Sequence, residues 1–280
     1  MTPSNLSTFT ASDGTNLAMQ HWPVAEGMRT HGTVLLVHGL GEHVGRYNHV
    51  AGYLNTLGFS VVGYDQYGHG ESGGARGTLS SETRLLDDLA DVIDSLRPPG
   101  RPALPLLLLG HSLGGLVAAR FVSLNMRPVS GLVMSSPALD PGLNAFQKFL
   151  LAILPRWLPN LQVGNGLKVD FLSHDANVVR DYRADRLVHK MVSPRLAHFI
   201  ADAGVATRAA AAHWRVPTLL LYAGNDKLVD PMGSKKFAKQ APHHYVQAHC
   251  FHDMYHEIFN EPGHGTVLAA LGQWLARNIK

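Results

Sequence analysis

The chain has 280 residues, of which 45% are hydrophobic and 16% charged, which predicts one large folded domain and excludes a disordered chain. Its formal net charge is +3, and the basic residues are spread without forming a run, so no nucleic-acid partner is expected. One cysteine excludes an internal disulfide framework, and the lack of a signal-peptide pattern or a long apolar run predicts a cytoplasmic protein.

Short apolar runs that end in glycine, aspartate, serine or proline recur along the chain. Runs of this kind are typical of strands buried on both faces of a parallel sheet. The runs cover residues 33–39, 59–65, 105–110, 131–137 and 217–224.

Helical patterns alternate with these strands, and Ser80 or Ser81 is the expected N-cap of the second helix. Residues 5–22 alternate around Asp13-Gly14, as an edge hairpin does. This order predicts an α/β fold, with helices covering a mostly parallel central sheet. The predicted helices cover residues 46–57, 81–96 and 113–126, with an amphipathic final helix over 265–280.

The segment from Ala138 to His213 interrupts the alternation of strands and helices. It has no buried-strand run, and its helical patterns are split by prolines and glycines. We therefore expect an inserted helical cap (lid) of residues 138–213 over the carboxyl edge of the sheet. The core is then formed by residues 1–137 and 214–280.

The sequence Gly110-His111-Ser112-Leu113-Gly114 fits the pattern G-x-S-x-G, and it stands between a predicted strand and a predicted helix. In this setting the serine occupies a strained turn, and the glycines leave room for neighbouring backbone. The following helix directs its N-terminal N–H groups at any charge that forms there. Ser112 is therefore the candidate nucleophile.

A serine nucleophile needs a base, and the base needs an orienting carboxylate. With a G-x-S-x-G turn, the acid follows the serine along the chain, and the histidine comes last. Asp226 lies in a loop just after the run 217–224, whereas Asp230 precedes Pro231, where a helix cap is expected. Asp226 is the predicted acid, and Asp230 is the alternative.

The base is harder to choose because the chain has 17 histidines. His256 lies in a loop before the final helix, a position that suits the base, and His252 is the alternative. The two are spaced like metal ligands on a helix, but the stretch H-D-M-Y-H lacks the partners of a zinc site. We expect no metal and no organic cofactor.

An acyl-transfer enzyme also needs an oxyanion hole. The first strand of the predicted parallel sheet ends in His38-Gly39-Leu40-Gly41, where His38 and the two glycines are expected to fix the turn. The backbone N–H groups of Leu40 and Leu113 are the predicted donors.

Residues 68–73 fit a second pattern, G-x-G-x-x-G, which could indicate a dinucleotide site. Such a site needs a helix that opens at the motif. Here several residues intervene before the next predicted helix, so nucleotide binding is not expected.

Five blocks carry a resemblance to a known family: HGLGEHVGRY, YDQYGHGESGG, LLGHSLGG, GNDKLVD and MYHEIFNE. In this order they resemble the monoglyceride lipase and lysophospholipase group of serine α/β-hydrolases, also classed as serine aminopeptidase-like. The resemblance covers nearly the whole chain and implies an α/β-hydrolase fold with a cap. It also implies a triad of Ser112, Asp226 and His256 with Leu40 and Leu113 as oxyanion donors.

The resemblance favours His256 over His252, because the base of the family occupies the third position of the MYHE stretch. Some members carry cysteines near a glycerol pocket, whereas Cys250 lies near the end of a predicted strand. Contacts specific to glycerol are therefore not carried over.

The cap carries an apolar stripe at helical spacing, and packing against the core is its favoured interpretation. Lys148 and Arg156 flank the stripe, so transient contact with a membrane or lipid surface is the alternative. The apolar residues are Phe146, Phe149, Leu150, Ile153 and Leu154, followed by Trp157 and Leu158.

These observations predict a serine carboxylic-ester hydrolase that forms an acyl-enzyme. Its expected substrate is a small-molecule acyl ester with a single chain, as for a monoacylglycerol lipase. One alternative is an esterase for short esters or polyester (hydroxyalkanoate) oligomers. From another class, the alternative is a non-catalytic binding protein with a hydrolase fold.

Overall fold

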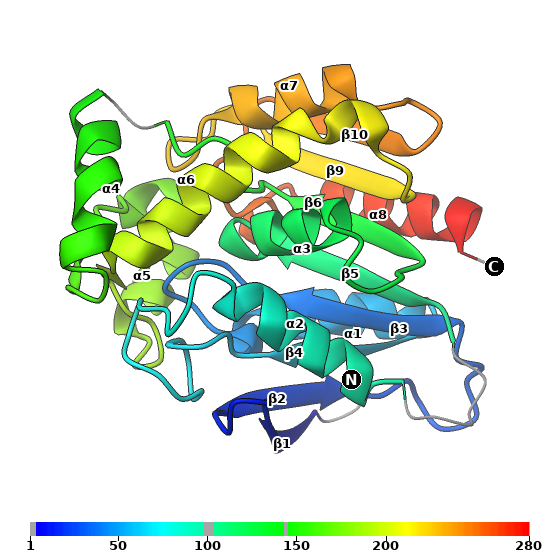
Figure 1. The fold of residues 1–280 in the computed structure, drawn as a ribbon. Coiled ribbons are helices and arrows are strands. Elements are labelled where there is room, and N and C mark those ends of the chain that lie inside the picture. Colours follow the sequence, from blue (N-terminus) through cyan, green and yellow to red (C-terminus); the bar gives the residue numbers. More distant parts are fainter. Residues whose placement is uncertain (1–3, 98–103, 143–144, 280) are drawn as a thin grey trace.

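The protein was analysed as a computed structural model, which describes residues 4–97, 104–142 and 145–279. An eight-stranded sheet in the order β1-β2-β4-β3-β5-β6-β9-β10 runs through the molecule (Figure 1). Its strands are β1 Asn5–Thr10, β2 Asn16–Trp22, β3 Gly32–Val37, β4 Phe59–Tyr64, β5 Leu106–His111, β6 Gly131–Ser135, β9 Thr218–Ala223 and β10 Val246–Phe251.

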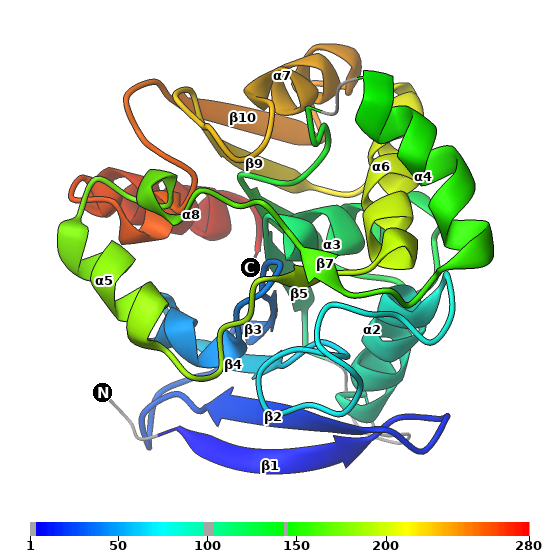
Figure 2. The same ribbon diagram turned by 90° about the vertical axis from the view of Figure 1, so that its left-hand side faces the viewer.

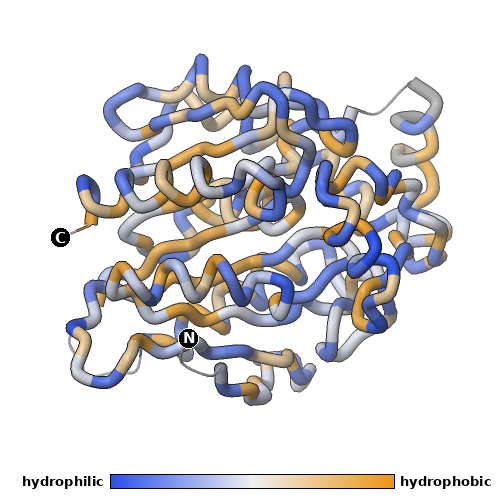
Figure 3. Tube along the Cα trace, turned by 180° about the vertical axis from the view of Figure 1, so that it is seen from behind, coloured by the Kyte–Doolittle hydropathy of each residue, from blue (hydrophilic) through white to orange (hydrophobic). Residues whose placement is uncertain are grey.

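The strands from β4 to β10 are parallel to their neighbours, and β1 and β2 add an antiparallel hairpin at one edge. The predicted α/β fold, the five predicted strands and the hairpin are therefore confirmed. All six residues of β5 are buried, which explains its run of four leucines. Hydrophobic residues follow the central strands in the tube of Figure 3.

Helices cover both faces of the sheet. The helices of the core are α1 Asn48–Thr56, preceded by the 3₁₀ turn η1 Val44–Tyr47, then α2 Arg84–Ser95, α3 Leu113–Ser123, α7 Pro231–Gln240 and α8 His264–Asn278, with the 3₁₀ turns η3 Ala211–His213 and η4 Ile258–Asn260.

The predicted N-cap of the second helix was wrong, because α2 begins at Arg84 with Thr83 at the N-cap position. Ser80 instead lies against Arg195, in the segment between β6 and β9. The backbone carbonyl oxygens of Leu79 and Ser80 accept hydrogen bonds from the Arg195 side chain at 2.7 and 3.0 Å. This tertiary contact overrides the local capping preference of serine.

The segment between β6 and β9 crosses one end of the sheet (Figures 1 and 2). It contains α4 Ala145–Trp157, η2 Val169–Phe171, α5 Ala176–Ala184 and α6 Pro194–Ala209. It also contains the two-residue strands β7 Val163–Gly164 and β8 Met191–Val192, which the sequence patterns did not predict. Among the described residues, no helix is long and apolar enough to cross a membrane.

Candidate active site

Ser112 lies in the turn between β5 and α3 with φ 53° and ψ −116°. A positive φ is uncommon for a residue other than glycine, so the surrounding contacts hold this turn. The N–H group of Ser112 donates to the Ser135 carbonyl oxygen at 2.9 Å, and the Ser112 carbonyl oxygen accepts from Leu116 and Ala138, each at 3.0 Å. The turn therefore positions the serine at the end of a buried strand.

The two motif glycines are required by close backbone packing. A Cβ atom on Gly110 would lie 2.3 Å from the carbonyl oxygen of Gly114. A Cβ atom on Gly114 would lie 2.0 Å from the carbonyl oxygen of Val37. These separations are far below van der Waals contact, so α3 packs closely against β5 at Gly110 and against β3 at Gly114 only because both side chains are absent.

The structure brings together the three residues predicted as nucleophile, base and acid. The Nε2 atom of His256 lies 2.9 Å from the Oγ atom of Ser112, and its Nδ1 atom lies 2.7 Å from Oδ2 of Asp226. The other Asp226 oxygen, Oδ1, accepts from the N–H groups of Leu228 and Val229 at 2.8 and 3.1 Å. These contacts give the acid a fixed orientation.

The two alternatives lie elsewhere. Asp230 caps α7, with its side chain accepting from the Met232 N–H group at 2.9 Å. The Nδ1 atom of His252 lies 3.8 Å from Sγ of Cys250. Cys250 itself is in β10, near the end of a strand as expected.

Asp226 and His256 shift each other's pKa in opposite directions. Burial alone would lower the pKa of His256, but the charge and hydrogen bond of Asp226 outweigh burial and raise that pKa above 6.5. Burial would raise the pKa of Asp226, but His256 and two backbone N–H groups lower it below 3.8. His256 can therefore accept a proton while Asp226 stays ionised.

Leu40 and Leu113, the predicted oxyanion donors, both lie at the site. Both residues line the same cavity as Ser112 and His256. Within the described part of the chain, neither N–H group donates a hydrogen bond. Leu113 is the first residue of α3, where an N–H group has no acceptor within the helix.

The cavity around Ser112 has a volume of about 540 Å³, within the usual range for small-molecule sites. Both the core and the segment between β6 and β9 contribute to its wall. Its apolar lining includes Leu40, Ala138, Leu172, Ile200 and Val229, and its polar lining includes Glu42, Asn165, Lys168, Tyr182, Lys227 and Glu257.

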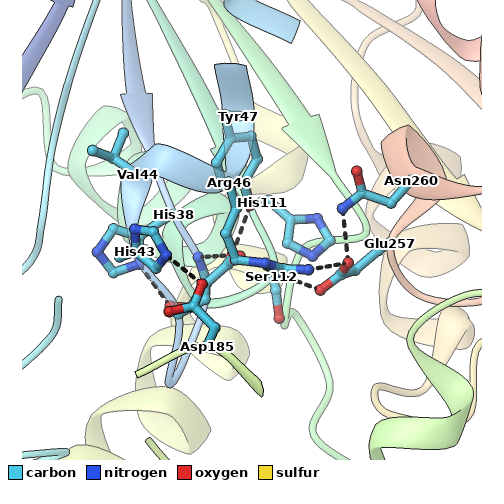
Figure 4. Close-up of polar contacts among 12 residues, drawn as sticks. His38, His43, Val44, Arg46, Tyr47, His111, Ser112, Asp185, Glu257 and Asn260 are labelled. Carbon is cyan, nitrogen blue, oxygen red and sulfur yellow. Dashed lines mark hydrogen bonds and ion pairs between the residues drawn. The ribbon is translucent and has the colours of Figure 1, made fainter. Parts of the chain in front are cut away.

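A buried charge network beside the cavity was missed from the sequence (Figure 4). The Arg46 guanidinium donates to both carboxylate oxygens of Glu257 at 2.7 Å and to Oε2 of Glu42 at 2.5 Å. Oε1 of Glu42 accepts from the Tyr47 hydroxyl and from the Gly39 N–H group, each at 2.6 Å. The network therefore reaches the predicted oxyanion turn.

Arg46 keeps both carboxylates of this network ionised. Burial would raise the pKa of Glu42, but Arg46 and neighbouring groups lower it to about 2. Burial also acts to raise the pKa of Glu257, and Arg46 again lowers it. The Arg46 guanidinium lies 4.7 Å from the ring centroid of Tyr182, which belongs to α5. The blocks HGLGEHVGRY and MYHEIFNE contain Glu42, Arg46 and Glu257, but neither block indicates how these residues pair.

His111 is a neutral neighbour of the candidate base. Its Nδ1 atom lies 3.1 Å from Oγ of Ser135, and its ring centroid is 4.8 Å from that of His256. Burial and the proximity of His256 lower its pKa to about 4.

The residues that the structure describes include no group of three His, Cys, Asp or Glu side chains arranged to hold a metal ion. Residues 68–73 lie in a loop, and the next helix, α2, begins at Arg84. The helix that a dinucleotide site needs is therefore not at this motif.

Part of the predicted apolar stripe is exposed. The Trp157 side chain is 79% exposed, and Leu150 and Leu154 are half-buried. The side chains of Phe146, Lys148 and Phe149 lie outside the described part of the structure. The other exposed apolar side chains near it are Ile153, Leu158, Leu161 and Val163.

Comparison with known proteins places these features in a family. Residues 28–263 match the serine aminopeptidase, S33 family. The chain is 31% identical to the monoacylglycerol lipase of Mycolicibacterium smegmatis over 251 residues, which cover 89% of each protein. It is 34% identical to phospholipase YtpA of Bacillus subtilis over 246 residues, 85% of this chain and 92% of that protein.

A solved structure gives the same result. The crystal structure of Paleococcus ferrophilus monoacylglycerol lipase aligns with a TM-score of 0.83 and 33% identity, over 94% of this chain and 99% of that one. The fold and the relatives define a serine hydrolase with the α/β-hydrolase fold. The chain belongs to the serine aminopeptidase, S33 family, which confirms the resemblance found in the sequence.

Proposed function

We propose that the chain hydrolyses carboxylic esters through an acyl-enzyme, with Ser112 as nucleophile, His256 as base and Asp226 as orienting acid. The observation that carries this proposal is the hydrogen-bonded series Ser112-His256-Asp226, at 2.9 and 2.7 Å, beside a cavity of about 540 Å³. His256 takes the proton of Ser112 as the hydroxyl attacks the ester, and gives it to the leaving alcohol. Asp226 holds the tautomer of the imidazole and offsets its positive charge.

The tetrahedral intermediate carries a negative charge on the former carbonyl oxygen. The N–H groups of Leu40 and Leu113 are proposed to stabilise it, because both residues line the cavity and neither amide has an acceptor among the described residues. A donor of this kind contributes on the order of 3 kcal/mol to the transition state.

The proposed substrate is an ester with a single acyl chain and a polar alcohol, such as a monoacylglycerol. The apolar wall of the cavity suits an acyl chain. Glu42, Glu257 and Tyr182 surround Arg46 and give the same cavity a polar wall, which suits a polar alcohol. The monoacylglycerol lipases among the relatives support this assignment.

Hydrolysis rates across p-nitrophenyl esters from short to long chains, beside a 1-monoacylglycerol and a hydroxybutyrate oligomer, test the proposal. We expect a maximum at medium or long chains with fast monoacylglycerol turnover. A maximum at the shortest chains with slow monoacylglycerol turnover would contradict the lipase assignment and favour an esterase for small esters or oligomers.

We further propose that residues 138–213 form a cap on a core of residues 1–137 and 214–280, and that the cap makes transient contact with lipid surfaces. The exposed side chains of Trp157, Leu158 and Leu161 support this contact. Co-sedimentation with phosphatidylcholine vesicles should fall in a Trp157→Glu/Leu161→Glu variant. Unchanged co-sedimentation would contradict it. The cytoplasmic location stays a prediction, and the single cysteine is compatible with a reducing compartment.

A further inference from the structure

Three buried histidines form a row behind the proposed oxyanion turn. His38 directly follows β3, His69 lies in the loop after β4, and His189 precedes β8. The ring centroids of His38 and His69 are 5.3 Å apart, and those of His69 and His189 are 4.6 Å apart. The row therefore joins the core to the segment between β6 and β9.

Backbone groups engage both ring nitrogens of His38 and Nδ1 of His69 and His189. Nε2 of His38 accepts from the Gln66 N–H group at 2.9 Å, so its Nδ1 donates to the carbonyl oxygen of Gly39 at 2.8 Å. Nδ1 of His69 donates to the Tyr67 carbonyl oxygen at 2.9 Å. Nδ1 of His189 accepts from the Met191 N–H group at 3.2 Å.

The second ring nitrogen, Nε2, is buried in both His69 and His189. Nε2 of His69 has no hydrogen-bond partner among the described residues, whereas the Gly68 backbone lies within hydrogen-bonding reach of the His189 ring. Burial lowers the pKa of all three rings, that of His189 to about 4, so they pack as neutral groups. Contact between the three rings, together with their hydrogen bonds to backbone, thus accounts for their placement.

His38 acts directly on the candidate oxyanion donor. The Gly39 carbonyl group and the Leu40 N–H group belong to one planar peptide unit, so the hydrogen bond from His38 also fixes the direction of the Leu40 N–H group. Hydrogen bonding at the carbonyl also polarises the peptide and strengthens the N–H group as a donor.

His189 holds the next part of the turn. The backbone N–H group of His189 donates to the carbonyl oxygen of Gly41 at 2.8 Å. Gly41 has φ +78°, and a Cβ atom there would lie 2.4 Å from the His189 carbonyl oxygen. Leu40 therefore lies between one peptide held by His38 and another held by His189.

The chain after His189 is itself fastened to the core. The N–H group of Ser193 donates to the Gly77 carbonyl oxygen at 2.8 Å, and a Cβ atom on Gly77 would lie 2.2 Å from the Met191 carbonyl oxygen. Residues 189–193 are thus held at two glycines, Gly41 and Gly77. The His69 ring lies between the rings of His189 and His38.

We propose that His69 and His189 are positioning residues for the oxyanion turn, which wedge residues 189–193 against His38 and so hold the Leu40 N–H group in place. The cap then takes part in transition-state stabilisation in addition to covering the substrate. This inference rests on the proposed role of Leu40 as an oxyanion donor.

The test measures kcat and KM for His69→Ala and His189→Ala, with active sites counted by reaction with a fluorophosphonate. We expect kcat to fall about 10- to 100-fold with KM within about twofold of wild type. Inhibition by an alkyl trifluoromethyl ketone, which forms an oxyanion with the serine, should weaken by a similar factor. Inhibition by the alcohol of the same chain length, which forms none, should stay unchanged.

Leu271→Ala in α8 is the control for a buried side chain lost far from the turn, and its kcat per active site should equal that of wild type. If His69→Ala does not fold, His189→Ala carries the test. Wild-type kcat in the folded histidine variants, or equal weakening of both inhibitors, would overturn the inference. Retained hydrolysis in Ser112→Ala would instead contradict the proposed function, so the two failures are distinguishable.

Discussion

The Nε2 atom of His256 lies 2.9 Å from the Oγ atom of Ser112, although 144 positions separate the two residues in the chain. The loop that carries His256 is held by the segment between β6 and β9. The His256 N–H group donates to the Phe171 carbonyl oxygen at 3.4 Å, and the Glu257 N–H group donates to that of Leu172 at 2.8 Å. Backbone hydrogen bonds to Phe171 and Leu172 thus help to position the candidate base.

Ser112→Ala should abolish ester hydrolysis, with a fall in kcat of at least about 10³-fold, because no acyl-enzyme can form. Labelling by a fluorophosphonate should disappear with it. Ser123→Ala, at the other end of α3, is the matched control and should keep both activities. Residual labelling of the Ser112→Ala protein would assign the nucleophile to another residue.

The rate should depend on pH through His256, which accepts a proton only when neutral. Since Asp226 raises the pKa of His256 above 6.5, kcat/KM should rise with pH and have its acid midpoint above 6.5. Asp226→Asn removes the charge that outweighs burial, so this midpoint should move to lower pH while kcat falls about 10³- to 10⁴-fold.

The control for this variant is Asp230→Asn, because Asp230 caps α7 and does not contact His256. It should keep the wild-type pH profile of kcat/KM. An acid midpoint that does not move in Asp226→Asn would show that Asp226 is not the partner of the base.

Arg46→Met should lower the free energy of unfolding by about 3–5 kcal/mol, because it leaves the buried carboxylates of Glu42 and Glu257 without their cation. Chemical denaturation measures this change. Arg127 pairs with Asp94 on the surface, so Arg127→Met should leave the unfolding transition nearly unchanged. Equal effects of the two substitutions would mean that burial of the network adds nothing to stability.

Gly114→Ala should destabilise the protein by about 1–3 kcal/mol and lower kcat, because its Cβ atom would lie 2.0 Å from the Val37 carbonyl oxygen and would displace the Ser112 turn. Gly265, in α8, has nothing within 4 Å of such an atom. Gly265→Ala should therefore leave kcat unchanged and raise the melting temperature slightly, since alanine favours a helix. A tolerated Gly114→Ala, with wild-type kcat and melting temperature, would contradict the packing argument.

The sequence by itself determined the α/β fold, five of the strands and the turn around Ser112. These features depend on local patterns: apolar runs, helical spacing, and glycines where α3 meets β3. The preference for Asp226 over Asp230 also came from local position, because Asp230 stands before Pro231 and a helix. The choice of His256 over His252 needed the family resemblance.

Only the tertiary structure decided which distant residues meet. Arg46 and Glu257 are 211 positions apart, and nothing in either segment indicates their partner. The row of His38, His69 and His189 likewise joins three separate segments. The start of α2 was set by contacts of Ser80 with Arg195, because a tertiary hydrogen bond outweighs a local capping preference. Pairings of this kind arise from chain topology, which brings together segments that no local pattern connects.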